Sequence, residues 1–76
     1  MKELLLYIAR SLVQHPDQVT VTEVENGDEL TLELRVAPED MGKVIGRHGR
    51  IAKEIRTLMK AAGNRQNKKV TVEIVD

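Results

Sequence analysis

Hydrophobic residues recur with two different periods along the chain, and these periods divide it into predicted helices and strands. Over residues 2–14 the apolar residues recur at helical spacing, and the pattern stops at His15-Pro16 because the residue before a proline disfavours a helix. Residues 18–25 are rich in β-branched side chains and predict a strand. Residues 29–36 and 69–75 alternate between apolar and polar residues, which predicts two further strands that each bury one face.

Turn and cap residues place the remaining elements. Asn26-Gly27 predicts a hairpin with a type I′ turn, in which both residues have positive φ. Glu39-Asp40 is predicted to open a short helix that runs to about Ile45, since acidic residues are favourable at the positive end of a helix dipole. A third helix is predicted over residues 50–62, with Gly63 as its stop. The predicted order of elements is α-β-β-α-α-β, with no internal repeat and no linker.

The predicted third helix has two chemically different faces. On a helical wheel its apolar residues form one stripe, and its basic residues form another on nearly the opposite side. We expect the apolar stripe to pack against a sheet and the basic stripe to form a cationic ridge. The apolar stripe comprises Ile51, Ile55, Leu58 and Ala62, and the basic stripe comprises Lys53, Arg56 and Lys60.

Length and composition limit the class of protein. A chain of 76 residues allows one domain, spanning residues 1–76, and 41% hydrophobic residues allow a small core. The chain has no cysteine, which excludes disulfides, and its one aromatic residue, Tyr7, argues against RNA-binding folds that stack bases on several aromatics. No apolar stretch approaches the length of a membrane span or a secretion signal, so we expect a soluble cytoplasmic protein.

Catalytic and metal chemistry is not expected. The sequence shows no carboxylate pair and no nucleophile beside a base, so it predicts neither an enzyme nor a cofactor. His15 and His48 have no third ligand at metal-binding spacing. The sequence also has no Walker loop, whose phosphate-binding segment ends in Gly-Lys-Ser/Thr.

The charges are strongly divided along the chain although the net charge is zero. Residues 1–40 hold three basic and nine acidic residues, a net charge of −6, whereas residues 41–76 hold nine basic and three acidic residues, a net charge of +6. Glu54 is the only acidic residue between positions 43 and 69. A local basic patch attracts polyanions even on a neutral molecule, so nucleic acid is a candidate partner.

Two glycines three positions apart, Gly46 and Gly49, separate the second and third predicted helices. A turn without side chains at either end lets a ligand backbone approach closely, and the N–H groups in the first turn of the next helix favour a phosphate. Basic residues surround this point, and the apolar residues just before it offer a floor for bases. The candidate RNA-binding residues are Lys43, Val44, Ile45, Gly46, Arg47, His48, Gly49, Arg50 and Lys53.

The segment Ile45-Gly46-Arg47-His48-Gly49 resembles the GXXG signature of KH domains, and the order of elements resembles their type II arrangement. This resemblance implies an α+β fold in which three helices cover one face of a three-stranded mixed sheet. The whole chain is similar to the small, free-standing bacterial KhpA family. That similarity implies a single-stranded RNA-binding protein and RNA chaperone that acts with a larger, KhpB-like KH protein in post-transcriptional control linked to cell envelope and cell length.

Two other classes of function are considered. The domain could serve mainly to assemble a protein partner, since the acidic residues of the predicted hairpin would suit a basic partner. A helix-turn-helix DNA reader is disfavoured, because the third helix offers Lys53, Arg56 and Lys60 but no asparagine or glutamine to read adenine.

The amount of apolar surface predicts that the protein associates. The first helix is apolar over much of its circumference, and Met41 and Val44 lie beside the two-glycine turn. A domain of this size can hardly bury all of these residues, so we expect a homodimer or a heterodimer with another KH protein. Linking two binding sites raises overall affinity by about 10²–10⁴ without any new RNA contact.

Overall fold

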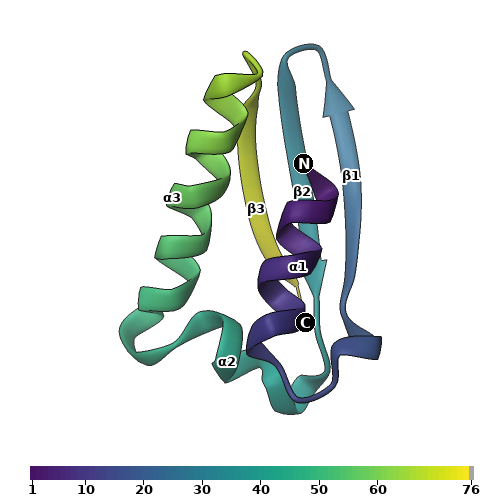
Figure 1. The fold of residues 1–76 in the computed structure, drawn as a ribbon, viewed down its shortest axis with the longest axis vertical. Coiled ribbons are helices and arrows are strands. Elements are labelled where there is room, and N and C mark those ends of the chain that lie inside the picture. The colour runs from purple at the N-terminus through teal and green to yellow at the C-terminus, as the bar shows by residue number, and fades with distance from the viewer. Residues whose placement is uncertain (76) are drawn as a thin grey trace.

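The computed structural model describes residues 1–75. It contains one three-stranded sheet (Figure 1). β2 lies in the middle of the sheet, antiparallel to β1 and parallel to β3. The sheet is therefore mixed, as the sequence predicts, and both outer strands have a free edge. The strands are β1 (Thr20–Asn26), β2 (Glu29–Arg35) and β3 (Lys69–Val75).

The helices pack on one face of the sheet and around one of its ends (Figure 1). α1 contacts β1, α3 runs along β3, and the short α2 joins the two helical parts at the end opposite the β1–β2 hairpin. None of the helices within residues 1–75 is long and apolar enough to cross a membrane. The helices are α1 (Lys2–Leu12), α2 (Met41–Ile45) and α3 (Arg50–Arg65), so the predicted α+β fold and element order are confirmed.

The hydrophobic core lies between the helices and the inner face of the sheet. Alternation along β2 places Leu30, Leu32 and Leu34 in this core, each no more than 5% exposed. The same alternation leaves Glu29 and Arg35 exposed. The side chains that the helices add to the core are Leu5, Ala9, Val44, Ile55 and Met59.

The connection between α1 and β1 differs from the prediction. α1 ends at Leu12 rather than at residue 14, and β1 begins at Thr20 rather than at residue 18. A short 3₁₀ helix, Pro16–Gln18, fills the space between them. Proline fixes the backbone angle that such a turn needs at its first position, so Pro16 begins this element instead of only ending the preceding one.

The end of α3 also differs from the prediction. The helix continues past Gly63 to Arg65, and Gly63 is a buried helical residue rather than a stop. A Cβ at Gly63 would lie 2.5 Å from Cγ2 of Val70, so glycine is needed here for close packing against β3. The left-handed residue that follows the helix is Asn67, with φ 57°.

The hairpin turn is shifted by one residue from its predicted place. Asn26 pairs with Glu29, so the two-residue loop consists of Gly27 and Asp28. Of the loop residues only Gly27 has positive φ, 66°. Positive φ at the first loop residue alone is typical of a type II′ turn rather than a type I′ turn, and Asn26 belongs to the strand.

α3 faces the sheet with a different side from the one predicted. Leu58, predicted to pack on the sheet, is 56% exposed, and its neighbour Met59 is 0% exposed. The buried stripe is rotated by roughly 75° from the predicted one on a helical wheel. Small residues let the helix approach the sheet closely, and the predicted stripe omits two of them, Ala52 and Gly63. The buried residues of α3 are Ala52, Ile55, Met59 and Gly63.

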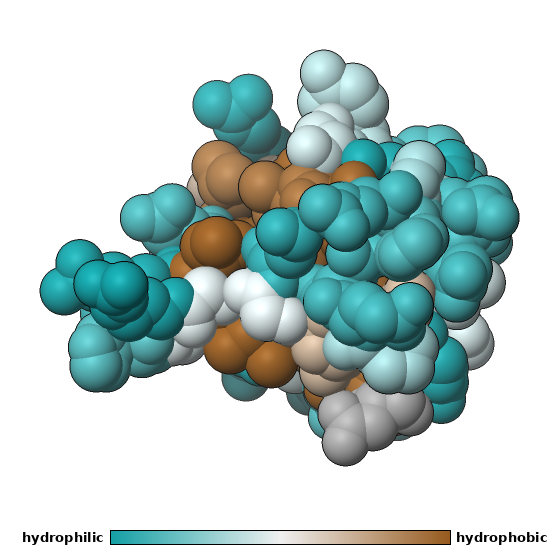
Figure 2. All heavy atoms as spheres, turned by 90° about the horizontal axis from the view of Figure 1, so that it is seen from below, coloured by the Kyte–Doolittle hydropathy of each residue, from teal (hydrophilic) through white to brown (hydrophobic). Residues whose placement is uncertain are grey.

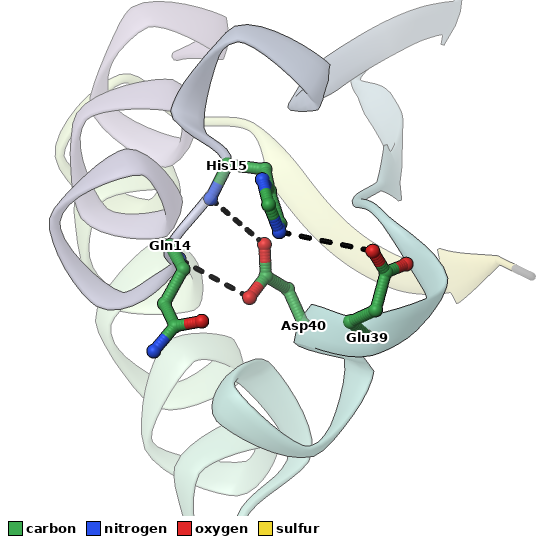
Figure 3. A network of polar contacts seen from close by, with 4 residues as sticks. All are labelled: Gln14, His15, Glu39 and Asp40. Carbon is green, nitrogen blue, oxygen red and sulfur yellow. Dashed lines mark hydrogen bonds and ion pairs between the residues drawn. The ribbon is translucent and has the colours of Figure 1, made fainter.

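Asp40 is fully buried and joins two separate parts of the chain (Figure 3). Its carboxylate accepts hydrogen bonds from the backbone N–H groups of Gln14, at 3.1 Å, and His15, at 3.0 Å. The prediction assigned Asp40 only a favourable place at the start of α2. The structure shows that its side chain also joins the segment that leaves α1 to the segment that enters α2.

Candidate nucleic-acid interface

The turn between α2 and α3 begins at Gly46, where φ is 77° and ψ is 173°. This region of backbone space is essentially restricted to glycine. Available space also requires glycine, because a Cβ at position 46 would lie 2.6 Å from Cγ1 of Ile51. Both the backbone angles and the available space therefore favour glycine at the start of the turn.

The other end of the turn is left-handed at two successive residues. φ is 58° at His48 and 73° at Gly49. Histidine adopts this conformation more often than most residues, although at a cost that glycine does not bear. A Cβ at Gly49 would meet nothing within 4 Å, so this end of the turn is open to solvent and a ligand backbone can approach it closely.

The first turn of α3 offers an anion a favourable position. Gly49 is the N-cap residue and no side chain caps the N–H groups of that turn, of which the first, that of Arg50, donates to the carbonyl of Arg47. Uncapped N–H groups and the positive end of the helix dipole both attract negative charge. Arg47, Arg50 and Lys53 lie in or just after the turn and are exposed, which adds full positive charges to the same end of the helix.

Most of the predicted site residues gather at this end of the molecule. Figure 2 shows the end from below, with hydrophobic groups exposed between hydrophilic ones. Ile45 and Ile51 are half-buried and packed against the core, so they can form an apolar floor beside the turn. Val44 is 0% exposed and can only support this floor from beneath, contrary to the predicted direct contact. The exposed predicted residues are Lys43, Arg47, His48, Arg50 and Lys53.

A groove between α3 and the free edge of β3 extends the site and was not predicted. Nε of Arg56 donates a hydrogen bond of 3.1 Å to the backbone carbonyl of Val72. Helical spacing predicts that Arg56 and Lys60 share a face with Lys53, but only the tertiary structure shows that this face borders a strand edge. A cavity of about 160 Å³ in the groove is lined by Arg56, Lys60, Val70, Thr71 and Val72.

The acidic residues of the β1–β2 hairpin lie at the opposite end of the sheet from the glycine turn (Figure 1). Glu25 forms an ion pair with Lys68, and the hydrogen bond and the positive charge of Lys68 lower the pKa of Glu25. Lys68 comes from the basic half of the sequence but lies at this hairpin end, where it compensates an acidic residue, whereas Arg47, Arg50 and Lys53 are exposed at the glycine-turn end. The glycine-turn end is the electrostatically favourable one for a polyanion.

A second apolar surface lies between α1 and α3. Tyr7 is 73% exposed and Leu58 is 56% exposed, and the two line the same groove. The sequence predicts unburied apolar surface on α1 and at Met41 and Val44 beside the glycine turn, but Val44 is part of the core and Met41 is packed against it. We call this surface the α1–α3 groove; its apolar residues are Leu4, Tyr7, Ile8, Leu58, Ala61 and Ala62.

Comparison with solved structures identifies the fold. The chain is similar to Era solved in complex with MgGDPNP and nucleotides 1506–1542 of 16S ribosomal RNA, with a TM-score of 0.58 and 22% identity. A variant of Aquifex aeolicus Era bound to GDP.AlF4- gives a TM-score of 0.59 at the same identity. The chain is matched over 96% of its length and spans 28% of the Era chain, so this likeness concerns the fold alone.

Comparison of sequences identifies the family. The chain is 61% identical to RNA-binding protein KhpA of Clostridium acetobutylicum and 60% identical to that of Clostridium perfringens, over 99% of this chain and 100% of each relative. It is 50% identical to RNA-binding protein KhpA of Listeria monocytogenes over the full length of both. Residues 2–74 match the family described as "KhpA/KhpB, KH domain". The chain therefore belongs to the KhpA/KhpB family of KH domains, which is not a family of enzymes.

Proposed function

We propose that this protein binds single-stranded RNA across the α2–α3 turn. The supporting observation is the open turn from Gly46 to Gly49, with an uncapped helix start and exposed basic residues beside it. One phosphate lies against the first turn of α3, where Arg47, Arg50 and Lys53 add positive charge. The adjoining bases rest on the apolar floor of Ile45 and Ile51. The relatives named as RNA-binding proteins support the same ligand.

RNA binding in this site depends mainly on electrostatic contacts with phosphates, so it should tolerate differences in RNA sequence. The aromatic side chain of Tyr7 lies in the α1–α3 groove, so bases near the turn have no aromatic platform on which to stack. With three or four phosphates neutralised, the logarithm of affinity should fall against the logarithm of salt with a slope of roughly −2 to −3. A slope near zero would contradict a site centred on phosphates.

A charge reversal in the turn tests this function. The double variant Arg47→Asp with His48→Asp places two carboxylates where the phosphate lies, so we expect it to lose RNA binding. Both side chains are exposed, and exposed substitutions usually change stability by no more than about 0.5 kcal/mol. A matched control, Asn26→Asp with Lys69→Asp, makes the same change in net charge at the hairpin end and should keep binding.

The readouts are fluorescence anisotropy with a labelled single-stranded RNA and thermal melting of each variant. Normal RNA binding by the double variant would show that the turn is not the binding site. Loss of RNA binding without loss of partner recovery or of cellular function would favour the alternative, in which the domain mainly assembles a protein partner.

We further propose that the protein acts as a homodimer or as a heterodimer with a larger KH protein. The α1–α3 groove supports this, because Tyr7 and Leu58 expose large apolar surfaces at one place on the molecule. A KH site clamps only about four nucleotides, and a second linked site raises affinity. Sedimentation equilibrium of Leu58→Glu tests the interface. Val24→Glu is the control, since Val24 is 51% exposed on another face.

The cellular role that we propose rests on family membership. An RNA chaperone in the cytoplasm, paired with a KhpB-like protein and acting on the cell envelope and cell length, agrees with a small, sequence-tolerant binding site. Pull-down of the native protein, followed by RNA sequencing and mass spectrometry on the same sample, tests both parts. Recovery of neither RNA nor a KH protein would contradict this role.

A further inference from the structure

We propose that the free edge of β1 binds an extended, lysine- or arginine-rich segment of another protein and adds it to the three-stranded sheet as a further strand. β1 and β3 lie on opposite sides of β2, so this surface is separate from the RNA site and does not depend on it. The free backbone groups of β1, the regular course of the strand and the acidic side chains along it carry the inference.

The outward backbone groups of β1 are open to a partner. β1 pairs with β2 alone and lies at the outer side of the sheet (Figure 1). The two-residue turn pairs Asn26 with Glu29, and successive residues of an antiparallel pair alternately direct their N–H and C=O groups toward and away from the partner strand. Counting back from Asn26, those of Glu25 and Glu23 point away from β2. Within residues 1–75, neither residue forms a backbone hydrogen bond to another element.

The edge of β1 is long and regular. Natural proteins usually protect a free edge with a proline, a bulge or a very short strand. β1 runs for seven residues, Thr20–Asn26, and this segment contains no proline. Each of these residues pairs with a single residue of β2, so the strand has no bulge. The edge can therefore accept a strand of similar length.

Acidic side chains select the charge of the partner. The hairpin, residues 20–35, holds five acidic residues and one basic residue, a net charge of −4. Glu23 and Glu25 are exposed and share a face of the strand with the buried Val21. Among residues 1–75, Glu23 makes no ion pair, whereas Glu25 pairs with Lys68. A lysine or arginine opposite Glu23 on an added strand therefore gains a cross-strand ion pair.

The same charges argue against a second copy of β1 as the occupant. Pairing of two β1 edges brings acidic residues of both copies together, and like charges directly opposite each other destabilise a sheet. The other face of the strand carries Thr22 and Val24, and Val24 is 51% exposed. These neighbours suit β-branched side chains. The matching segment thus has a basic residue at every second position, with threonine or valine between.

Binding of a synthetic peptide tests this assignment on the full-length protein without RNA. The probe is a fluorescent peptide as long as β1, in which lysine and threonine alternate and lysine stands at both ends. Anisotropy at low salt should show that it binds, and an analogue with glutamate in place of each lysine should not. Backbone hydrogen exchange, followed by NMR, should slow at Glu23 and Glu25 on binding. It should change little at Thr22 and Val24, whose N–H groups face β2.

Two N-methylated peptides separate strand addition from attraction by charge alone. One is methylated at the backbone nitrogen of each lysine and the other at that of each threonine, so both keep the charge and each loses one set of donors. Only one set faces β1 in an added strand, and the strand direction decides which. We expect one methylated peptide to lose affinity by about fivefold or more and the other to bind as the parent does.

Charge variants of the protein complete the test. Glu23→Lys should lower the affinity for the lysine peptide by about fivefold or more, and Glu23→Gln should lower it less. Glu54→Lys is the matched control, because it makes the same change in charge at an exposed position on α3 and should keep peptide binding. Thermal melting separates a loss of folding from a loss of recognition, and Glu23→Gln keeps the test valid if the lysine variant unfolds.

Four results would overturn the assignment. Failure of the lysine peptide to bind would show that the glutamates only protect the edge. Equal affinities of the parent and both methylated peptides, or equal losses in Glu23→Lys and Glu54→Lys, would show attraction by charge alone. Slow exchange at Glu23 and Glu25 that increases with protein concentration before peptide is added would show that a second copy occupies the edge. None of these results affects the glycine turn, whose failure would instead be normal RNA binding by the Arg47→Asp, His48→Asp variant.

Discussion

Gly46 and Ile51 lie in direct contact across the α2–α3 turn, so that a Cβ at position 46 would stand 2.6 Å from Cγ1 of the isoleucine. The contact joins the two halves of the candidate site. Gly46 sets the path of the turn, and Ile51 forms part of its apolar floor. The geometry of the phosphate position therefore depends on a glycine that need not touch the RNA.

We expect Gly46→Ala to lower the free energy of unfolding by about 2–4 kcal/mol, because backbone strain and overpacking act together. Gly49→Ala should cost only about 1–2 kcal/mol, since its Cβ would meet nothing and only the left-handed strain applies. Urea unfolding measures both. If the steric contact matters, Gly46→Ala combined with Ile51→Ala should be more stable than the sum of the single changes implies.

The left-handed backbone conformation of His48 should lower the stability of the fold. With φ 58° it lies in the left-handed region, where glycine has no steric penalty. We therefore expect His48→Gly to raise the free energy of unfolding by about 1 kcal/mol. Arg47→Gly is the control: Arg47 has no positive φ, so that change should lower stability by about 0.5–1 kcal/mol. A less stable His48→Gly would mean that the imidazole makes stabilising contacts.

The strands and the glycine turn could be predicted because their signals are local. Alternation along 29–36 depends on the two-residue period of a strand, and Gly46 and Gly49 stand where backbone angles favour glycine. The same local logic failed at Asn26-Gly27, because the partner strand set the register and moved the turn by one residue. It also failed at Gly63, whose role comes from the closeness of Val70.

The basic residues of the site were predicted, but the sequence did not predict which of them border the edge of β3. Lys53, Arg56 and Lys60 form one stripe by helical spacing alone. Which of them meets a strand edge depends on how α3 is rotated, and that rotation is set by small residues such as Ala52 packing on the sheet. The burial of Asp40 likewise depends on a segment more than twenty positions away in the sequence.

Asp40 should be one of the most sensitive polar positions in the chain. Asp40→Asn keeps the size of the side chain but turns one acceptor oxygen into a donor, so a partly buried backbone N–H loses its partner. We expect a loss of about 1–3 kcal/mol in the free energy of unfolding. Glu39→Gln is the matched control: the Glu39 side chain is 66% exposed and 3.7 Å from His15, so its effect should stay within about 0.5 kcal/mol. Equal losses of stability in the two variants would contradict the role of Asp40 in joining the segment after α1 to the segment before α2.

The ion pair between Glu25 and Lys68 should make a small, pH-dependent contribution to stability. Lys68 lowers the pKa of Glu25 below its ordinary value of 4.5, so the folded state favours the carboxylate. The contribution is thus present above pH 4.5 and is lost as pH falls through the lower, folded-state pKa. Glu25→Gln should lower the melting temperature slightly at neutral pH and low salt, and not at all in strong acid or high salt. A difference that persists in acid would exclude this ion pair as its cause.

Gly63 and Gly42 should respond in opposite directions to the same substitution. Gly63 lies in the last turn of α3 and Gly42 in the first turn of α2, and within a helix alanine is normally better than glycine by up to about 0.8–1.0 kcal/mol. At Gly42 a Cβ would meet nothing within 4 Å, so we expect Gly42→Ala to raise stability by up to about 1 kcal/mol.

At Gly63 the added Cβ would lie 2.5 Å from Cγ2 of Val70 and 2.8 Å from the carbonyl oxygen of Lys68. The backbone there cannot move away easily, because the N–H of Lys68 donates to the carbonyl of Gly63 at 2.9 Å. Overpacking therefore outweighs propensity, and Gly63→Ala should lower the free energy of unfolding by about 1–3 kcal/mol. Urea unfolding of the two variants decides the matter. A Gly63→Ala protein as stable as Gly42→Ala would show that β3 can shift along α3, and the groove that contains Arg56 would then be adjustable rather than fixed.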